Sequence, residues 1–197
     1  MSKPAFTRAE PDARRQSLVA ACARVLAREG AGGASVRSIA VEAGVSPGLI
    51  THYFAGVDAL IAATYAQVGE RVTAALTAAV AAAGDAPRAR LAAYVTASFA
   101  PPIADPELLA TWTALWSMVR ARPAIAEWHD RIYARYRGDL EALLGGCGVA
   151  ARDCRLTAIA ITALVDGLWL ELCLSPGSFT PDEARAIAEA HLAGVLG

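Results

Sequence analysis

Apolar residues recur at helical spacing along almost the whole chain, and this pattern limits the possible folds more than any other feature of the sequence. Near the N-terminus, Leu18, Cys22, Val25 and Leu26 occupy positions i, i+4, i+7 and i+8, which lie on one face of a helix. Strand-like alternation is almost absent, and alanine, the best intrinsic helix former, is abundant. The sequence therefore predicts an all-α fold.

Glycine, proline and capping residues divide the periodic segments into about nine helices. The side chains predicted to cap helix N-termini are Asp12, Ser35, Ser46, Asp153 and Thr180. Glycines and prolines end the helices, because neither residue continues a helix well. The predicted helices cover residues 12–29, 35–43, 46–54, 56–83, 87–99, 106–122, 123–144, 153–174 and 180–196.

The charge balance excludes one class of nucleic-acid-binding protein. The 197 residues include 18 Lys and Arg against 19 Asp and Glu, for a formal net charge of −1, so the chain is not globally basic like a histone. Residues 1–60 nevertheless hold seven basic and five acidic side chains, whereas the remainder holds 11 basic and 14 acidic ones. The N-terminal part is therefore the part that suits a phosphate surface.

Several other classes of protein lack their sequence signature in this chain. The four cysteines form no C-x-x-C pair and have no histidine pair at metal spacing, so we expect no metal site, no cofactor and no disulfide framework. This cysteine usage is typical of a reducing cytoplasm. The N-terminus has no signal-peptide core, and no run of about 18 uninterrupted apolar residues predicts a membrane span.

The segment SVRSIAVEAGVSPGLITHYF, from Ser35 to Phe54, is the most specific feature of the sequence. Two short helices are joined at Gly44, which adopts positive φ without steric cost. The small Ala40 suits two helices that cross closely at about 90–120°, as in a helix-turn-helix. The side chains expected to point into the seam between these helices are Ile39, Val45, Ile50 and Phe54.

The outward side of the second short helix has the properties of a surface that enters a DNA groove. It is small and polar at its N-terminal end and contains no acid, so it can approach the phosphates that flank a major groove about 12 Å wide. In any pair of short helices, the first can end at Gly and the second can begin with Ser-Pro. Here, however, the helix spacing, the N-cap residue and the aromatic C-terminal end of the second helix also match a helix-turn-helix. The residues predicted to face DNA on this helix are Ser46, Pro47, Gly48, Thr51, His52 and Tyr53.

These motifs resemble the TetR family of one-component repressors. Within that family, SPGLITHYF, ALVDGLWL (163–170) and WTALW (112–116) are similar to the BetI-type, choline-responsive branch. The resemblance covers the whole chain and implies a helix-turn-helix DNA-binding head over residues 1–56 and a ligand-binding and dimerisation body over residues 57–197. It also implies a homodimer through the last two helices, although the apolar helix over 153–174 could equally be the core helix of its own body.

The resemblance further implies which residues contact DNA, and it includes one departure. The positions that match DNA contacts in the family are Ser35 and Arg37 of the supporting helix, and Ser46, Gly48, Thr51, His52 and Tyr53 of the recognition helix. Val57 stands where the family has a lysine, and the loss of this phosphate anchor predicts weaker binding with a shallower salt dependence. The N-terminal arginines either compensate or belong to a solvated, disordered arm; they are Arg8, Arg14 and Arg15.

Aromatic and acidic residues of the body suit a pocket for an organic cation, because aromatic faces attract cations and a carboxylate supplies the counter-charge. The candidate ligand-binding residues are Trp112, Trp116, Asp166 and Trp169, followed by Trp128, Tyr133 and Glu171. The alternative is that the aromatic side chains only fill the core and that Asp166 forms a hydrogen bond across a dimer. His129 fits a surface histidine better than a switch.

The sequence supports three possible functions to different degrees. The leading interpretation is a cytoplasmic repressor that binds double-stranded operator DNA and is released by a small-molecule effector. An enzyme lacks support, because no metal-binding pair, Ser/His/Asp set or phosphate loop occurs. A helical adaptor without sequence-specific DNA binding is the alternative, supported by Val57 and the near-neutral charge.

Overall fold

The computed structural model describes residues 9–197, and within that range it contains helices and no strand. This confirms the all-α prediction, with nine α-helices and one short 3₁₀ helix in the described residues. The elements are α1 (Ala9–Gly33), α2 (Val36–Ala43), α3 (Pro47–Tyr53), α4 (Val57–Ala82), α5 (Pro87–Thr96), the 3₁₀ helix η1 (Ala97–Phe99), α6 (Pro106–Met118), α7 (Pro123–Gly146), α8 (Ala151–Leu174) and α9 (Pro181–Leu196).

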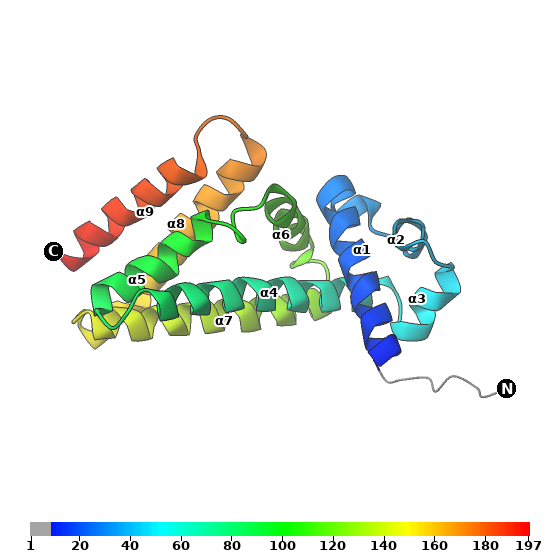
Figure 1. The fold of residues 1–197 in the computed structure, drawn as a ribbon, viewed down its shortest axis with the longest axis horizontal. Helices are drawn as coiled ribbons and strands as arrows, with labels where there is room; N and C mark the ends of the chain where they lie inside the picture. The colour runs from blue at the N-terminus through cyan, green and yellow to red at the C-terminus, as the bar shows by residue number, and fades with distance from the viewer. Residues whose placement is uncertain (1–8) are drawn as a thin grey trace.

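The helices form a small head at one end of an elongated body (Figure 1). The head consists of α1, α2 and α3, and α4 leaves it to run along the body beside α7. The α5, α8 and α9 helices complete the far end of the body, and α6 lies between them and α1. At Gly69 of α4, an added Cβ atom would lie 2.5 Å from Cδ1 of Ile132 on α7, so these two long helices approach closely because position 69 has no side chain.

The core of the head is the apolar set that the helical spacing predicted. The side chains of Leu18, Cys22, Val25 and Leu26 on α1 are fully buried. They pack with Ala40 and with three of the four predicted seam residues, Ile39, Ile50 and Phe54, all of which are also buried. The fourth, Val45, is only partly buried against this core. Burial of this set fixes the angles between α1 and the two short helices α2 and α3, which would not be stable alone.

Two predicted N-caps are wrong, and the error has a common cause. The α1 helix already includes Asp12, and the α8 helix begins at Ala151 after Ala150, so that Asp153 lies in its first turn. Acidic residues are favourable both at the N-cap and in the first turn of a helix, so composition alone does not separate the two positions. The caps at Ser35 and Thr180 are confirmed, each as a capping box with the residue three positions later. Ser46 occupies the N-cap position of α3 as predicted, but its side chain forms no capping hydrogen bond.

Several helix ends also differ from the predicted ones. The α6 helix ends at Met118 rather than Arg122, and Arg122, which precedes Pro123, is extended (φ −130°, ψ 104°). The α7 helix continues to Gly146 rather than Leu144. Residues 97–99 form a 3₁₀ turn instead of the last turn of α5. The predicted stop at Gly30 appears as a kink with φ 67° and ψ −170°, after which the chain continues helically to Gly33.

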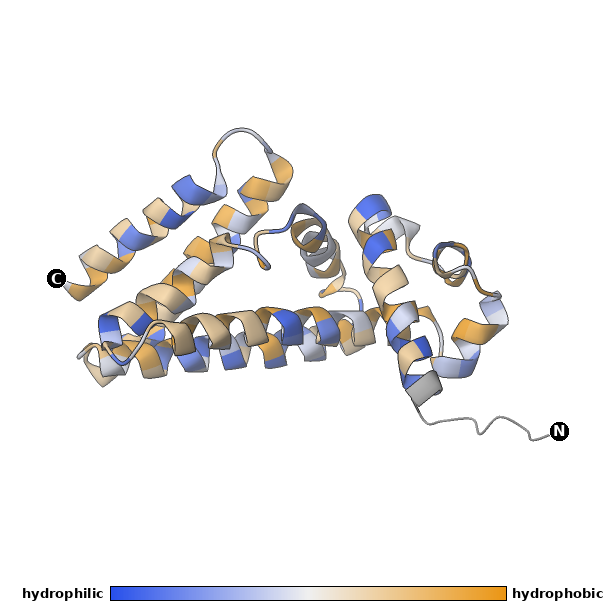
Figure 2. Cartoon of the chain, in the orientation of Figure 1, coloured by the Kyte–Doolittle hydropathy of each residue, from blue (hydrophilic) through white to orange (hydrophobic). Residues whose placement is uncertain are grey.

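The α8 helix is less covered than the sequence predicted. It is long and apolar enough, by length and composition, to span a membrane, which we did not expect from the sequence. Hydrophobic residues run along most of its length (Figure 2). It packs on α6, α7 and α9 on one side, but Leu156 and Leu174 are 65% and 63% exposed. A single chain therefore buries only part of this helix.

The conformation of Gly44 gives a first testable prediction. Gly44 ends α2 with φ 65° and ψ 35°, a left-handed conformation that costs a side-chain-bearing residue about 1–2 kcal/mol. We expect Gly44→Ala to lower the free energy of unfolding by about that amount in urea melts. Gly138→Ala is the matched control, because Gly138 lies inside α7 with open space around its Cβ position, and alanine there stabilises a helix by about 0.5–1 kcal/mol. Equal effects of the two substitutions would contradict the prediction.

Candidate functional site

Local hydrogen bonds hold both the start of α2 and the turn between α2 and α3. Ser35 Oγ accepts a hydrogen bond from the backbone N–H of Ser38 at 3.0 Å, and the backbone N–H of Ser35 donates to Ser38 Oγ at 2.9 Å. After Gly44, the backbone N–H of Val45 donates to the carbonyl oxygen of Ala40 at 3.0 Å. Pro47 occupies the first position of α3, where a missing N–H costs nothing. The direction of α3 is therefore fixed by the backbone itself.

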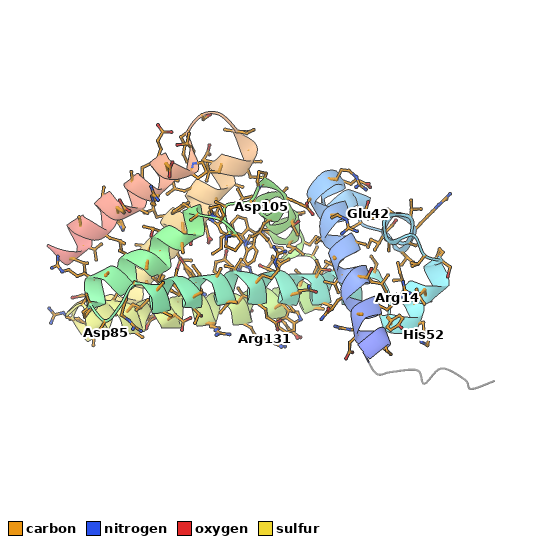
Figure 3. All side chains as sticks on the ribbon, viewed as in Figure 1. Arg14, Glu42, His52, Asp85, Asp105 and Arg131 are labelled. Atoms are coloured by element: carbon orange, nitrogen blue, oxygen red, sulfur yellow. The ribbon has the colours of Figure 1, made fainter. Side chains whose placement is uncertain are left out.

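The predicted DNA-facing residues all lie at the surface of the head. Tyr53 is half-buried, and the exposed residues are Ser35, Arg37, Ser46, Pro47, Gly48, Thr51 and His52. The Thr51 hydroxyl donates to the carbonyl oxygen of Gly48 at 3.0 Å, and the rings of His52 and Tyr53 meet edge to face at 5.2 Å. Figure 3 places His52 at the head end, far from Asp85 at the other end of the body.

Two acids of the head, Glu29 and Glu42, are paired with arginines of α1. Glu42 on α2 accepts hydrogen bonds from Arg24 at 2.6 Å and from Arg28 at 2.9 Å, both on α1. These two hydrogen bonds lower the pKa of the Glu42 carboxyl, and the contacts of Arg28 with Glu29 and Glu42 raise the pKa of Arg28. The recognition helix α3 itself contains no acid.

The N-terminal arginines divide into residues inside and outside the described range. Arg8 lies outside it. Arg14 and Arg15 are exposed and belong to α1, so the disordered-arm interpretation is wrong for these two residues. Arg15 lies over the Phe54 ring at 4.9 Å from the ring centre. Among the side chains of residues 11–197, Arg14, Arg15 and Arg37 form no ion pair with one another or with an acid, which leaves the exposed Arg37 of α2 available to an external anion.

Val57 is the first residue of α4 and follows Gly56, whose φ is 114°. It is half-buried against the core, and the neighbouring Asp58 is paired with Arg122 of the body at 2.7 Å. The first turn of α4 therefore contains no basic residue of its own, and the Arg122 guanidinium beside it is paired with Asp58.

We expect Val57→Lys to strengthen non-specific binding to duplex DNA and to steepen its salt dependence. One added phosphate contact per head changes the slope of log K against log salt concentration by about 0.9. Fluorescence-anisotropy titrations over a range of NaCl concentrations measure this slope. Ala74→Lys adds the same charge at an exposed position of α4 in the body, and an equal change in that control would contradict the prediction.

An internal cavity of about 40 Å³ lies in the body, between α4, α6, α7 and α8. Three of the four candidate ligand-binding residues line it, namely Trp112, Asp166 and Trp169. The Trp112 ring meets Trp169 edge to face at 5.6 Å, and the indole N–H of Trp169 donates to the carbonyl oxygen of Ser98 at 2.9 Å. The lining residues that the sequence analysis did not single out are Val72, Thr73, Leu76, Ser98, Ile132, Tyr136 and Val165.

The fourth candidate, Trp116, does not line the internal cavity. It lines a neighbouring surface groove of about 520 Å³, formed by α6, α7 and α8, which we call the α7/α8 groove. Asp166 and Tyr133 line both spaces, so they form the wall between the cavity and the groove. Trp128 lines neither and lies under Arg131 at 4.7 Å, and Glu171 is exposed.

Asp166 is the centre of the electrostatics of this region. Burial raises the pKa of its carboxyl to about 6, an effect that the Tyr133 hydrogen bond and the nearby Arg137 partly oppose. The Tyr133 hydroxyl donates to Asp166 Oδ1 at 3.0 Å. Burial and the negative charge of Asp166 raise the pKa of the Tyr133 hydroxyl, so it remains a hydrogen-bond donor at neutral pH. The carboxylate is therefore held in place at the boundary between two spaces.

His129 differs from the surface histidine that we expected. It is half-buried, its Nδ1 is hydrogen-bonded to the Tyr65 hydroxyl at 3.0 Å, and its ring stacks on Tyr133 at 4.2 Å. Burial lowers its pKa, which favours the neutral ring beside the groove. The neutral His129 ring therefore adds no positive charge to that of Arg137 near Asp166.

Several polar atoms around the two spaces have no internal partner. Within the described residues, the indole nitrogens of Trp112 and Trp116 and the Tyr136 hydroxyl are buried without a hydrogen bond. Buried polar groups normally have a partner, so these atoms indicate contact with water or a ligand. Aromatic faces beside one carboxylate form a site that suits an organic cation. No group of His, Cys, Asp and Glu among residues 9–197 is arranged to hold a metal.

A capped helix pair that presents an acid-free second helix, attached to a body with an aromatic pocket, defines a helix-turn-helix DNA-binding regulator. Residues 18–64 match the tetR family of bacterial regulatory proteins, and residues 87–197 match the C-terminal domain of BetI-type transcriptional repressors. The chain belongs to the TetR family and has a BetI-type body. Regulators of this family bind operator DNA and act as dimers.

Individual relatives agree with this assignment. The chain is 34% identical to the HTH-type transcriptional regulator BetI of Burkholderia thailandensis over 91% of both chains, and 32% identical to that of Vibrio parahaemolyticus over 92% of both. A solved structure of a putative transcriptional regulator from Pseudomonas aeruginosa PAO1 has a TM-score of 0.86 at 42% identity, covering 98% of this chain and 95% of that one. A putative regulator from Saccharomonospora viridis, solved in complex with choline, shares the fold, with a TM-score of 0.80 at 18% identity over 92% and 96% of the two chains.

Proposed function

We propose that this protein is a repressor that binds operator DNA through its head and leaves the DNA when an organic cation binds in its body. The observation that carries the proposal is the outward side of α3, which is exposed, free of acids and fixed in direction by the Gly44 turn. We propose that the boundary between head and body lies between residues 56 and 57, a position supported by the start of α4 at Val57. The residues that we propose to contact DNA are Ser35, Arg37, Ser46, Pro47, Gly48, Thr51, His52 and Tyr53.

The effector is proposed to be a small organic cation, and Asp166 is proposed to be its counter-charge. The aromatic side chains of Trp112 and Trp169 line the internal cavity, Trp116 lines the adjoining groove, and Asp166 lies between them. The internal cavity alone is smaller than such a ligand requires, so we place the cation against Asp166 on the groove side. The choline complex of the Saccharomonospora viridis regulator shows that a protein of this fold holds such a cation.

The α6 helix offers a direct mechanical link between this site and the head. Trp112 of α6 faces the cavity, and the hydroxyl of the adjacent Thr111 donates to the carbonyl oxygen of Ala23 on α1 at 3.1 Å. A shift of Trp112 on ligand binding would therefore move α1. A ligand that binds the two states with a 100-fold difference shifts the balance by about 2.7 kcal/mol.

The proposed assembly is a homodimer through α8 and α9. The exposed apolar side chains of these helices include Leu156, Ile159, Leu174 and Ile187, which support a contact with a second copy. A two-fold dimer presents two heads to half-sites that are about 34–36 Å apart, or a multiple of this distance. The two α3 helices can then read one operator in the cytoplasm.

The direct test is a titration of the purified dimer against the DNA upstream of its own gene. We expect a sequence-specific complex at moderate salt, which adding choline releases. Release by neutral or acidic compounds, with no response to choline or other amines, would contradict the cationic effector while leaving the regulator intact. A correctly folded dimer that fails to bind any such DNA at low salt would instead favour the helical adaptor.

A further inference from the structure

A continuous apolar stripe runs along the uncovered side of α8. Its members follow one another at intervals of three or four residues, so they share one helix face. The stripe, which we call the α8 outer face, comprises Leu156, Ile159, Ala163, Gly167, Leu170 and Leu174. In its middle, Ala163 and Gly167 leave the backbone almost bare, and no atom lies within 4 Å of the Cβ position of Gly167.

The α7/α8 groove opens on this same face. Ile159, Ala163, Gly167 and Leu170 belong both to the α8 outer face and to the lining of the groove, where they adjoin Asp166. Anything that covers the outer face therefore also covers the groove. In a single chain, the groove is therefore open to solvent on the side of the α8 outer face. A ligand that contacts Asp166 and Trp116 would be uncovered on that side.

A second copy of this chain is the cover that this apolar stripe fits. Regulators of this family act as dimers, and in a two-fold contact, residue i meets residue j of the partner and j meets i. An antiparallel crossing of two α8 helices centred on Ala163 therefore places residues that precede Ala163 by a given number against the partner's residues that follow it by the same number.

The same register matches the apolar residues of the stripe. Leu156 and Leu170 are each seven residues from Ala163, so they meet across the contact. Ile159 and Gly167 are each four residues from it, so the partner's Ile159 faces the open space at Gly167. A shallow crossing of about 20° keeps these pairs together along the helices.

We propose that the effector site is composite: the α8 outer face of a second copy crosses at Ala163 and closes the α7/α8 groove over Asp166, with the partner's Ile159 as part of its roof. This inference rests on the proposed cationic effector. Neither chain alone encloses the cation, so effector binding and dimerisation strengthen each other through thermodynamic linkage. The affinity for the cation then depends on the fraction of dimer.

Two leucine substitutions of equal exposure test the register. In Leu156→Glu, a charge is placed against the partner's Leu170, and we expect the dimer dissociation constant in sedimentation equilibrium to rise at least about 100-fold. In Leu174→Glu, the matched control, the new charge lies beside the partner's Arg152, because both positions are eleven residues from Ala163, and we expect no weakening. Both leucines are mostly exposed in the single chain, so each variant should fold. Equal dissociation of both variants, or of neither, would overturn the crossing.

The composite nature of the site is tested with choline as the probe. We expect Leu156→Glu to bind choline at least tenfold more weakly than the wild type at concentrations where it is monomeric, and to recover affinity as the protein concentration rises. A monomer that binds choline as tightly as the wild-type dimer would overturn the composite site and leave the cationic effector standing. No choline binding by the wild-type dimer would reject the cationic effector and the composite site together, and sedimentation would still decide the crossing.

Discussion

His52→Ala is expected to lower the affinity for the operator at least about 30-fold while leaving the melting temperature almost unchanged. Each specific side-chain contact with a base contributes about 1–3 kcal/mol, and a dimer loses two such contacts. His52 is exposed at the end of α3, so its removal costs little packing. The measurement is a gel-shift titration with a thermal melt of the same sample.

Tyr53 separates contact from packing more finely than His52 does. Its ring is half-buried against the head core, so Tyr53→Ala should weaken DNA binding and also lower the melting temperature slightly. Tyr53→Phe retains the ring, so it should retain the stability and lose only what the hydroxyl contributes to binding. Arg131→Ala in the body, also exposed, is the control and should bind DNA normally. If His52→Ala unfolds the head as much as it weakens binding, the residue has a packing role.

Asp166→Asn is expected to weaken the choline response at least about 30-fold, because removing one member of a buried charge pair costs about 2–5 kcal/mol. Repression in the absence of effector should persist, since Asp166 belongs to α8 of the body and not to the head. Asparagine still accepts the hydrogen bond from Tyr133, so the wall between cavity and groove keeps its shape. The measurement is release of a bound operator by increasing choline, and wild-type release by this variant would contradict the role of Asp166.

The same variant should also be more stable than the wild type at pH 7.5, by about 3 kcal/mol. Burial raises the pKa of Asp166 to about 6 in the folded chain, above its ordinary value of 3.8. The wild type is therefore stabilised at low pH by the protonated carboxyl and loses this contribution as the pH rises through 6. Asparagine does not titrate, so the difference between the two proteins should nearly disappear near pH 4. Urea melts at both pH values measure it.

The head could be predicted almost completely from the sequence because its determinants are local. Ser35, Gly44 and Pro47 each act within one turn of the helix that they begin or end, and the buried positions follow the helical period. Errors arose where two positions favour the same residue type, as with Asp12 and Asp153. Pro123 could have indicated the early end of α6, because the residue before a proline avoids the helical conformation.

The body could be predicted only in part, because its site brings together residues from separate helices. Helical periodicity gave the aromatic residues of α6 but not the rotation that turns Trp112 to the cavity and Trp116 to the groove. Ser98, Tyr136 and Arg137 carry no local signal of their roles. The partners of His129, which lie on α4 and α7, depend on the close approach of those helices.

The neighbouring positions of Thr111 and Trp112 on α6 have a consequence for how such a protein can change over evolution or by design. Thr111 forms the hydrogen bond to α1, and the adjacent Trp112 lines the internal cavity. Ligand selectivity and the link to the head would therefore depend on different residues. We expect that substitutions at Trp112 can change which ligand is bound while the hydrogen bond from Thr111 to α1 is retained. A biosensor for a new compound could therefore be designed by substituting cavity-facing residues of α6 while the DNA-binding head, α1 to α3, stays unchanged.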